Sequence, residues 1–191
     1  MKKIAVTGGL AVGKSTVCEF LAELGAYVVS ADEIVRQLLQ ADSPTGQLVI
    51  KLLGSGIITK NQIDRKKISN IVFSNPAQLK ALEQILHPAV RHEIQRLFDS
   101  VKNNAAYKFF AAEVPLLYEA RMENEFDAVI TVIADEKIAK DRTANEEEFE
   151  RRSRFQLPQA AKETKATYVI KNEGDLSALK AQVTALIPQL L

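Results

Sequence analysis

Short apolar stretches recur along the chain, and amphipathic segments separate them. Each stretch is rich in Val, Ile, Ala, Phe or Tyr, which is typical of a buried strand. The stretches are residues 4–7, 26–29, 107–112, 128–133 and 167–170. Because helical patterns lie between them, this order predicts an α/β protein with a five-stranded parallel sheet that helices cover on both faces.

Polar residues follow the carboxyl ends of these expected strands, the edge at which ligands bind in parallel sheets. The first strand runs into a glycine-rich turn, the second into Ser30 and Asp32, and the third ends at Glu113. These positions are therefore the first candidates for a functional site.

The glycine-rich turn is a complete phosphate-binding loop. Residues 8–15 read G-G-L-A-V-G-K-S, which fits G-x-x-x-x-G-K-S, and a helical pattern follows them as far as Gly25. In such a loop, backbone N–H groups surround a polyphosphate, the lysine reaches its terminal groups and the serine hydroxyl ligates Mg²⁺. We expect a nucleoside triphosphate to bind here; the alternative is a chance glycine-rich turn before a helix. The expected contacts are Gly8, Gly9, Ala11, Val12, Gly13, Lys14, Ser15 and Thr16.

The segment between the second and third strands is far longer than one crossover helix requires. Helical patterns begin near Ile34 and at Pro44, Asp64 and Pro76, and His87-Pro88 is expected to end the fourth helix before a fifth begins. We interpret residues 42–104 as a helical acceptor-binding region; the alternative is a purely structural insertion.

Residues 135–165 form a second unusual segment, because they are strongly charged and include Arg142, Arg151 and Arg152. A lid that carries arginines over a nucleotide has this composition, and so does a solvated pair of helices. The 191 residues then form a single domain with its core at 1–41, 105–134 and 166–191.

Composition limits the partners. Lys plus Arg number 25 against 24 Asp plus Glu, and this net charge of +1 gives no basic footprint for nucleic acid. No apolar run approaches the roughly 20 residues of a membrane span, and the N-terminus enters a strand at once. We expect a soluble, cytoplasmic monomer or weak homo-oligomer, with no nucleic-acid or membrane partner. The single Cys18 is expected to pack as a small apolar group rather than react.

The phosphate loop alone does not identify the reaction. A GTPase would carry N-K-x-D after a late strand, whereas residues 172–175 read N-E-G-D. A small chain with an acceptor region and a lid is typical of a small-molecule kinase.

Several segments resemble dephospho-CoA kinases. Residues 7–16 are similar to T-G-G-I-x-S-G-K-S-T, and residues 25–36 to G-x-x-V-x-D-A-D-x-I-x-R. Further matches are residues 86–91 to L-H-P-x-[IV]-R, 113–119 to [DE]-x-P-L-L-[FY]-E, 156–158 to Q-x-P and 168–176 to D-x-V-I-x-N-x-G-D-L. The matches run in order and cover nearly the whole chain.

The resemblance implies a P-loop kinase-like three-layer α/β/α fold with a helical acceptor-binding insertion and a short lid. It also implies the last step of CoA biosynthesis, in which ATP phosphorylates the ribose 3′-hydroxyl of dephospho-CoA with Mg²⁺ as cofactor. The alternatives are a nucleoside or nucleoside monophosphate kinase and a non-catalytic ATP-dependent switch.

The resemblance assigns roles to single residues. Lys14 and Asp32 are catalytic, with Asp32 as general base; alternatively, Asp32 only caps a helix. Ser15 and, through water, Glu113 hold the metal, unless Glu113 is a surface or capping carboxylate. The expected acceptor contacts are Arg36, His87, Arg91, Leu116 and Leu117, and Arg142 is expected to bind ATP. For His87, the alternative is a helix cap or a core side chain.

Two positions depart from the family pattern. Ser30 replaces the first Asp of D-A-D, which weakens any metal or substrate role there. The lid is shorter than usual, and residues 142–146 replace its R-D-G-L-S run, so Arg142 aligns with either of two lid arginines.

Overall fold

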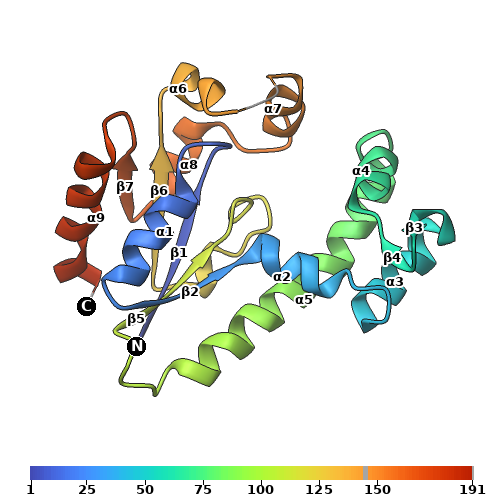
Figure 1. The fold of residues 1–191 in the computed structure, drawn as a ribbon, viewed down its shortest axis with the longest axis horizontal. Helices are drawn as coiled ribbons and strands as arrows, with labels where there is room; N and C mark the ends of the chain where they lie inside the picture. The colour runs from blue at the N-terminus through green and yellow to red at the C-terminus, as the bar shows by residue number, and fades with distance from the viewer. Residues whose placement is uncertain (144–145, 191) are drawn as a thin grey trace. The chain divides into compact units, whose positions relative to one another are not determined.

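The computed structural model describes residues 1–143 and 146–190 and divides into two compact units. The sheet unit comprises Met1–Ser30 and Leu97–Leu191, and the helical unit comprises Ala31–Arg96. The helical unit therefore begins immediately after the second strand of the chain (Figure 1).

The sheet unit contains the five-stranded parallel sheet that the apolar stretches predict. Its strands are β1 (Lys2–Gly8), β2 (Ala26–Ser30), β5 (Phe109–Glu113), β6 (Ala128–Ile133) and β7 (Tyr168–Lys171). They lie in the order β2-β5-β1-β6-β7, and every neighbouring pair is parallel. The strand that leads into the phosphate loop is thus the central one, with a paired strand on either side.

Helices cover both faces of this sheet, which confirms the three-layer α/β/α arrangement. On one face, α1 (Lys14–Glu23) and α9 (Leu176–Leu190) lie side by side (Figure 1). They bury the strand residues Ile4, Val6, Phe109, Ala111, Ile130 and Val132. On the other face, Phe98 packs edge-on against Phe110, and α8 (Gln159–Lys165) lies over Thr131. The remaining helices of the unit are α6 (Glu136–Asp141) and α7 (Glu146–Ser153).

Cys18 lies in the core of the sheet unit, as the sequence predicts. It is only 3% exposed and belongs to the cluster beneath α1. Burial, reinforced by the negative charge of Glu113, raises the pKa of its thiol far above the usual value. The side chain therefore stays protonated and packs as a small hydrophobe.

The helical unit is built from α2 (Ala31–Leu38), α3 (Pro44–Leu53), α4 (Arg65–Phe73) and most of α5 (Pro76–Val101). Local signals set their starts: the Ser43 hydroxyl accepts from the Gly46 N–H at 2.8 Å, and Asp64 accepts from the Lys66 N–H at 2.9 Å. Both starts agree with the sequence. The unit has its own core, formed by Leu39, Val49, Ile57, Ile68, Val72 and Leu82.

A small hairpin between α3 and α4 was not expected from the sequence. The short 3₁₀ helix η1 (Ser55–Ile57) leads into β3 (Ile58–Thr59), which pairs with β4 (Gln62–Ile63). The two turn residues, Lys60 and Asn61, have φ values of 49° and 62°, as a two-residue hairpin turn of this hand requires. Strands of two residues carry too little periodicity for sequence analysis to detect.

A second short 3₁₀ helix, η2 (Glu123–Glu125), precedes β6 in the sheet unit. No helix in the described ranges is long and apolar enough to cross a membrane.

The prediction that His87-Pro88 ends one helix and starts another was wrong. α5 runs without a break through Pro88, so His87 lies inside the helix and does not cap it. The φ angle that the proline ring imposes is compatible with a helix. Proline destabilises the helix only because it lacks the N–H of one hydrogen bond and because its ring clashes with a carbonyl of the preceding turn. Buried side chains on both sides, among them Leu82 and Val90, outweigh that local cost and keep the helix continuous.

Replacing Pro88 with alanine should raise stability. Pro88→Ala restores the missing N–H and removes the clash, and proline is about 3 kcal/mol worse than alanine in a helix interior. We expect a gain of about 1–3 kcal/mol in urea denaturation. Pro76→Ala is the matched control, because Pro76 begins the same helix, where the missing N–H has no partner in the helix. Equal effects of the two variants would show that Pro88 is not under strain.

Candidate functional site

The phosphate loop joins the central strand β1 to α1. Gly13 precedes the first residue of α1 and has a φ of 94°, while Ala11 and Gly8 have φ values of 56° and 148°. Such left-handed positions turn successive backbone N–H groups toward one point and create an anion-binding concavity. The positive end of α1 adds to this potential.

Two positions of the loop require glycine, both because their φ angles are positive and because neighbouring atoms leave no room for a side chain. A β-carbon on Gly8 would lie 2.2 Å from the Val132 carbonyl oxygen, and one on Gly13 would lie 2.2 Å from Nδ2 of Asn172. Neither approach leaves space for any side chain. The loop is therefore fitted closely against β6 and the residues after β7.

Asn172 fixes the loop from the opposite side. Its Nδ2 donates to the Val12 carbonyl at 2.9 Å, and its backbone N–H donates to Ile133 at 2.8 Å. Its own carbonyl accepts from Nη2 of Arg142 at 3.4 Å. The side chain is buried, so one residue joins the phosphate loop, the end of β6 and Arg142.

Lys14, Ser15 and Glu113 come together at the start of α1. Lys14 is 8% exposed and donates from Nζ to the Gly9 carbonyl at 2.6 Å. The Ser15 hydroxyl donates to Oε1 of Glu113 at 3.1 Å. Glu113 ends β5, in register with Val6 of β1 on one side. A hydroxyl and a carboxylate oxygen at this edge are the hard ligands that suit Mg²⁺, which keeps several waters and the phosphates as its other ligands.

A pocket of about 670 Å³ adjoins the phosphate loop within the sheet unit. It is lined by Gly13, Thr16, Arg142, Asn172, Gly174, Asp175, Leu176 and Ser177. Arg142 follows the last residue of α6 and reaches the pocket beside Asn172. A cavity of this size accommodates a small ligand such as a nucleoside.

The acceptor-side candidates Asp32, Arg36, His87 and Arg91 all lie in the helical unit. α2 begins at Ala31, so Asp32 lies in its first turn and not at the preceding cap position, which corrects the capping alternative. At this position the negative charge of Asp32 interacts favourably with the helix dipole of α2. The side chain is exposed. Arg36 follows one turn later and pairs with Glu33.

His87 and Arg91 are one helical turn apart on α5. Burial lowers the pKa of His87, and the charge of Arg91 adds to this shift while Glu83 opposes it. The imidazole is therefore neutral near pH 7, with one hydrogen-bond donor and one acceptor.

Of the two leucines that were expected to contact the acceptor, only Leu116 is accessible at the surface. Leu116 is 38% exposed, whereas Leu117 is fully buried. Residues 144–145 of the expected lid lie outside the described residues, and so do the side chains of Arg151 and Arg152.

A buried ion pair that sequence analysis did not identify supports this edge of the sheet. Nζ of Lys162 lies 2.9 Å from Oε1 of Glu119 and donates to the Pro115 carbonyl at 2.9 Å. The same Glu119 oxygen accepts from the Leu157 N–H at 2.7 Å. The pair thus connects the loop after β5 to α8 and to the segment after α7. In the sequence, Lys162 is one of many charged residues in its segment, and only the motif around Glu119 was a signal.

The chain is similar to known kinases over its whole length. Residues 2–178 match the model of a family described as dephospho-CoA kinase. The dephospho-CoA kinase of Protochlamydia amoebophila is 43% identical over 100% of this chain and 97% of its own. That of Aquifex aeolicus is 36% identical over 100% and 98%.

Solved structures agree with these relatives. A Thermus thermophilus crystal structure has a TM-score of 0.84 at 28% identity and covers 100% of this chain and 98% of its own. The dephospho-CoA kinase of Campylobacter jejuni has a TM-score of 0.72 at 27% identity, with 98% and 96% covered. A shikimate kinase from Bacteroides thetaiotaomicron, 12% identical with a TM-score of 0.57, shares the fold and covers 99% and 98%.

Breaking the buried pair should destabilise the sheet unit. Lys162→Met leaves the Glu119 carboxylate, whose side chain is 17% exposed, without its cation, and an uncompensated charge that is largely buried costs up to about 3–5 kcal/mol. Urea denaturation measures the loss. Lys165→Met, on the exposed side of the same helix, is the control and should cost less than about 1 kcal/mol. Adding Glu119→Gln to Lys162→Met should restore part of the stability, and an additive double variant would argue against a coupled pair.

Proposed function

This chain belongs to the dephospho-CoA kinase family, and we propose that it transfers the γ-phosphate of ATP to the ribose 3′-hydroxyl of dephospho-CoA. The observation that carries the proposal is the phosphate loop with Lys14 and Ser15 at the first turn of α1. The products are CoA and ADP, as in the last step of CoA biosynthesis. A nucleoside monophosphate kinase is not favoured, because the family match extends over residues 2–178.

On the ATP side, the loop from Gly8 to Thr16 is proposed to hold the triphosphate. Its N–H groups surround the phosphates, and Lys14 neutralises the charge that spreads over them in the transition state. The pocket between Arg142 and Asn172 is proposed to receive the adenosine. The hydrogen bond from Arg142 to the carbonyl of Asn172, the residue that also contacts the loop, supports this assignment.

The oxygens of Ser15 and Glu113 fit the magnesium ion that such a reaction uses. Their contact at 3.1 Å places a hydroxyl and a carboxylate together at the start of α1. We propose that Ser15 ligates the ion directly and that Glu113 orients its water shell. Held by these residues, the ion would offset the negative charge of the phosphates during transfer.

On the acceptor side, Asp32 is proposed to accept the proton of the 3′-hydroxyl. The ribose oxygen then forms its bond to the γ-phosphorus, and the bond from phosphorus to the ADP oxygen breaks. Arg36, His87 and Arg91 are proposed to bind the acceptor, with Leu116 as an apolar contact. Ser30 carries no charge, so Asp32 acts without the neighbouring carboxylate of the family pattern.

We propose no nucleic-acid or membrane partner for this function, since a net charge of +1 offers little attraction to polyanions. The expected cytoplasmic location and the monomer or weak homo-oligomer stay predictions.

An acceptor panel tests the function. ADP release should depend on dephospho-CoA and on Mg²⁺, and it should be far slower with AMP, CMP, adenosine or no acceptor. A coupled assay measures this rate, and the product should carry its new phosphate on the ribose 3′-oxygen. Lys14→Ala is the negative control and should lose about a hundredfold or more. Equal rates with a nucleoside monophosphate would refute the proposal.

The role of Asp32 is tested separately. Asp32→Asn keeps size but removes the proton acceptor, so kcat should fall roughly 10²–10⁴-fold while ATP affinity stays near normal. Titration with an ATP analogue measures that affinity. The control is Asp99→Asn, an exposed carboxylate near the end of α5, which should keep normal turnover. Normal turnover of a folded Asp32→Asn protein would leave the proposed mechanism without a base.

A further inference from the structure

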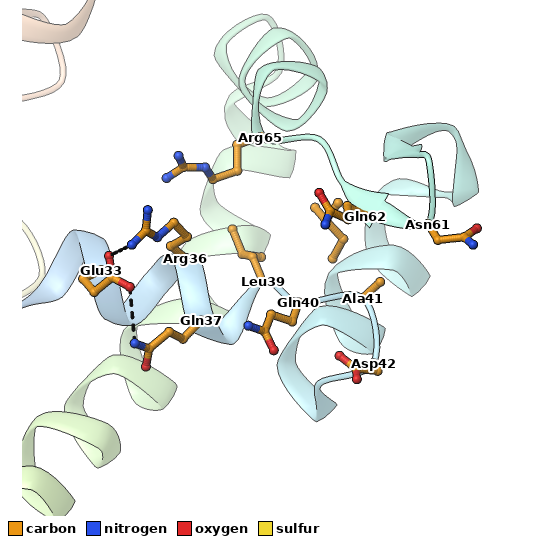
Figure 2. A pocket seen from close by; sticks show the side chains of 11 residues that line it. Glu33, Arg36, Gln37, Leu39, Gln40, Ala41, Asp42, Asn61, Gln62 and Arg65 are labelled. Atoms are coloured by element: carbon orange, nitrogen blue, oxygen red, sulfur yellow. Dashed lines mark hydrogen bonds and ion pairs between the residues drawn. The ribbon is translucent and has the colours of Figure 1, made fainter.

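The helical unit contains a cavity of about 830 Å³ that none of the assigned roles explains as a whole (Figure 2). Its walls come from α2, from the segment that follows α2, from the β3–β4 hairpin and from the first residue of α4. Cavities of this volume are typical of sites for cofactor-sized ligands.

Two arginines from different elements reach one end of this cavity. Arg36 comes from α2 and Arg65 from the start of α4; the Arg36 guanidinium lies against the carboxylate of Glu33, and the Arg65 guanidinium lies beyond that of Arg36 (Figure 2). Arg36 donates to Glu33, and Nε2 of Gln37 donates to its other oxygen at 3.3 Å. The hydrogen bond from Arg36 contributes most to lowering the pKa of Glu33, and the charge of Arg65 adds a smaller share.

One carboxylate therefore faces two cations: Glu33 pairs with Arg36, and Arg65 lies beyond Arg36 (Figure 2). The other acidic residue of the lining, Asp42, lies at the far end of the cavity (Figure 2). An intrahelical pair of Glu33 and Arg36 would account for α2 alone. It does not account for Arg65, which enters from α4 and gives the same end of the cavity a second positive charge.

Guanidinium groups match phosphate oxygens through paired hydrogen bonds. We propose that Arg36 and Arg65 bind the 5′-diphosphate of dephospho-CoA and that Glu33 is an internal counter-ion which the diphosphate displaces. The inference rests on the proposed function and adds Arg65 and Glu33 to it. Arg36 lies one helical turn from Asp32 on α2. The 3′-hydroxyl and the 5′-diphosphate belong to the same ribose, so adjacent sites for the two groups are required.

The rest of the lining suits the remainder of such a ligand. Beyond the arginines, the lining includes the amide side chains of Gln40 and Gln62 beside the apolar Leu39 and Ile63, whereas the Asn61 side chain points away from the arginines (Figure 2). A pantetheine arm alternates amide groups with methylene segments. Amide side chains can pair with the former, and apolar ones can cover the latter.

Binding measurements on the full chain test the site. The phosphate loop is first saturated with a non-hydrolysable ATP analogue and Mg²⁺, so that it cannot take up the probe. Inorganic pyrophosphate, dephospho-CoA and adenosine are then titrated by calorimetry. Arg65→Ala should weaken pyrophosphate and dephospho-CoA about tenfold or more, because a charged hydrogen-bonding partner is lost. Adenosine, which has no diphosphate, should bind Arg65→Ala and the unaltered chain alike.

Two further variants distinguish specific binding at this site from non-specific attraction of an anion to positive charge. Glu33→Gln removes the counter-ion and should tighten pyrophosphate about two- to fivefold, the scale of an exposed ion pair. Arg65→Lys keeps the charge but loses the planar fork, so its loss should be intermediate. Lys66→Ala is the matched control, because Lys66 is the exposed neighbour of Arg65 and does not line the cavity. Its effect should stay within about twofold.

The outcomes distinguish the site from the activity. If Arg65→Ala binds pyrophosphate and dephospho-CoA no more weakly than Lys66→Ala does, the site is refuted, whether or not the chain phosphorylates dephospho-CoA. If Glu33→Gln weakens pyrophosphate, the counter-ion role is refuted. If the unaltered chain does not phosphorylate dephospho-CoA, the proposed function fails, and the pyrophosphate titrations still decide whether the arginines form an anion site.

Discussion

The close approach of the phosphate loop to its neighbouring strands is the constraint on which the sheet unit depends. At Gly8 and Gly13 the backbone lies so near β6 and Asn172 that no β-carbon fits. Asn172 completes this contact from the other side by donating to the Val12 carbonyl. This close packing sets the point at which α1 starts, and the hydrogen bonds of Lys14 to the Gly9 carbonyl and of Ser15 to Glu113 then orient the two side chains at its first turn.

Buried polar groups extend this fixed geometry away from the loop. Asn172 also accepts from Arg142, and the Glu119–Lys162 pair joins the loop after β5 to α8 and to the Leu157 N–H. The buried members, Asn172 and Lys162, are costly to bury singly and become favourable only when each has a partner. Residues 135–165 are therefore connected to the rest of the sheet unit at two further points, through Arg142 and through the Leu157 N–H.

The sequence predicts the sheet well because its strands are buried on both faces and are therefore continuous apolar runs. The predicted bounds of β6 agree with the structure at both ends, and those of the other four strands differ from it by one or two residues. The sequence predicts the phosphate loop because all of its residues are contiguous. Asn172 and Lys162 could not be found in this way, since their partners Val12 and Glu119 are distant in sequence and only folding brings them together. The predicted break at Pro88 was wrong because side-chain packing along α5, which the local sequence does not show, overrides the helix-breaking preference of proline.

The buried thiol of Cys18 has a consequence for the chemical durability of the protein. It is the only cysteine of the chain, and it lies on the helix that starts at Lys14. Oxidants and alkylating agents attack the thiolate, and here the thiol is both protonated and shielded from solvent. Damage at this position therefore requires α1 to separate from the sheet. A ligand bound at the N-terminus of α1 opposes that separation, so an occupied phosphate loop should slow oxidation of Cys18, which does not itself contact the ligand.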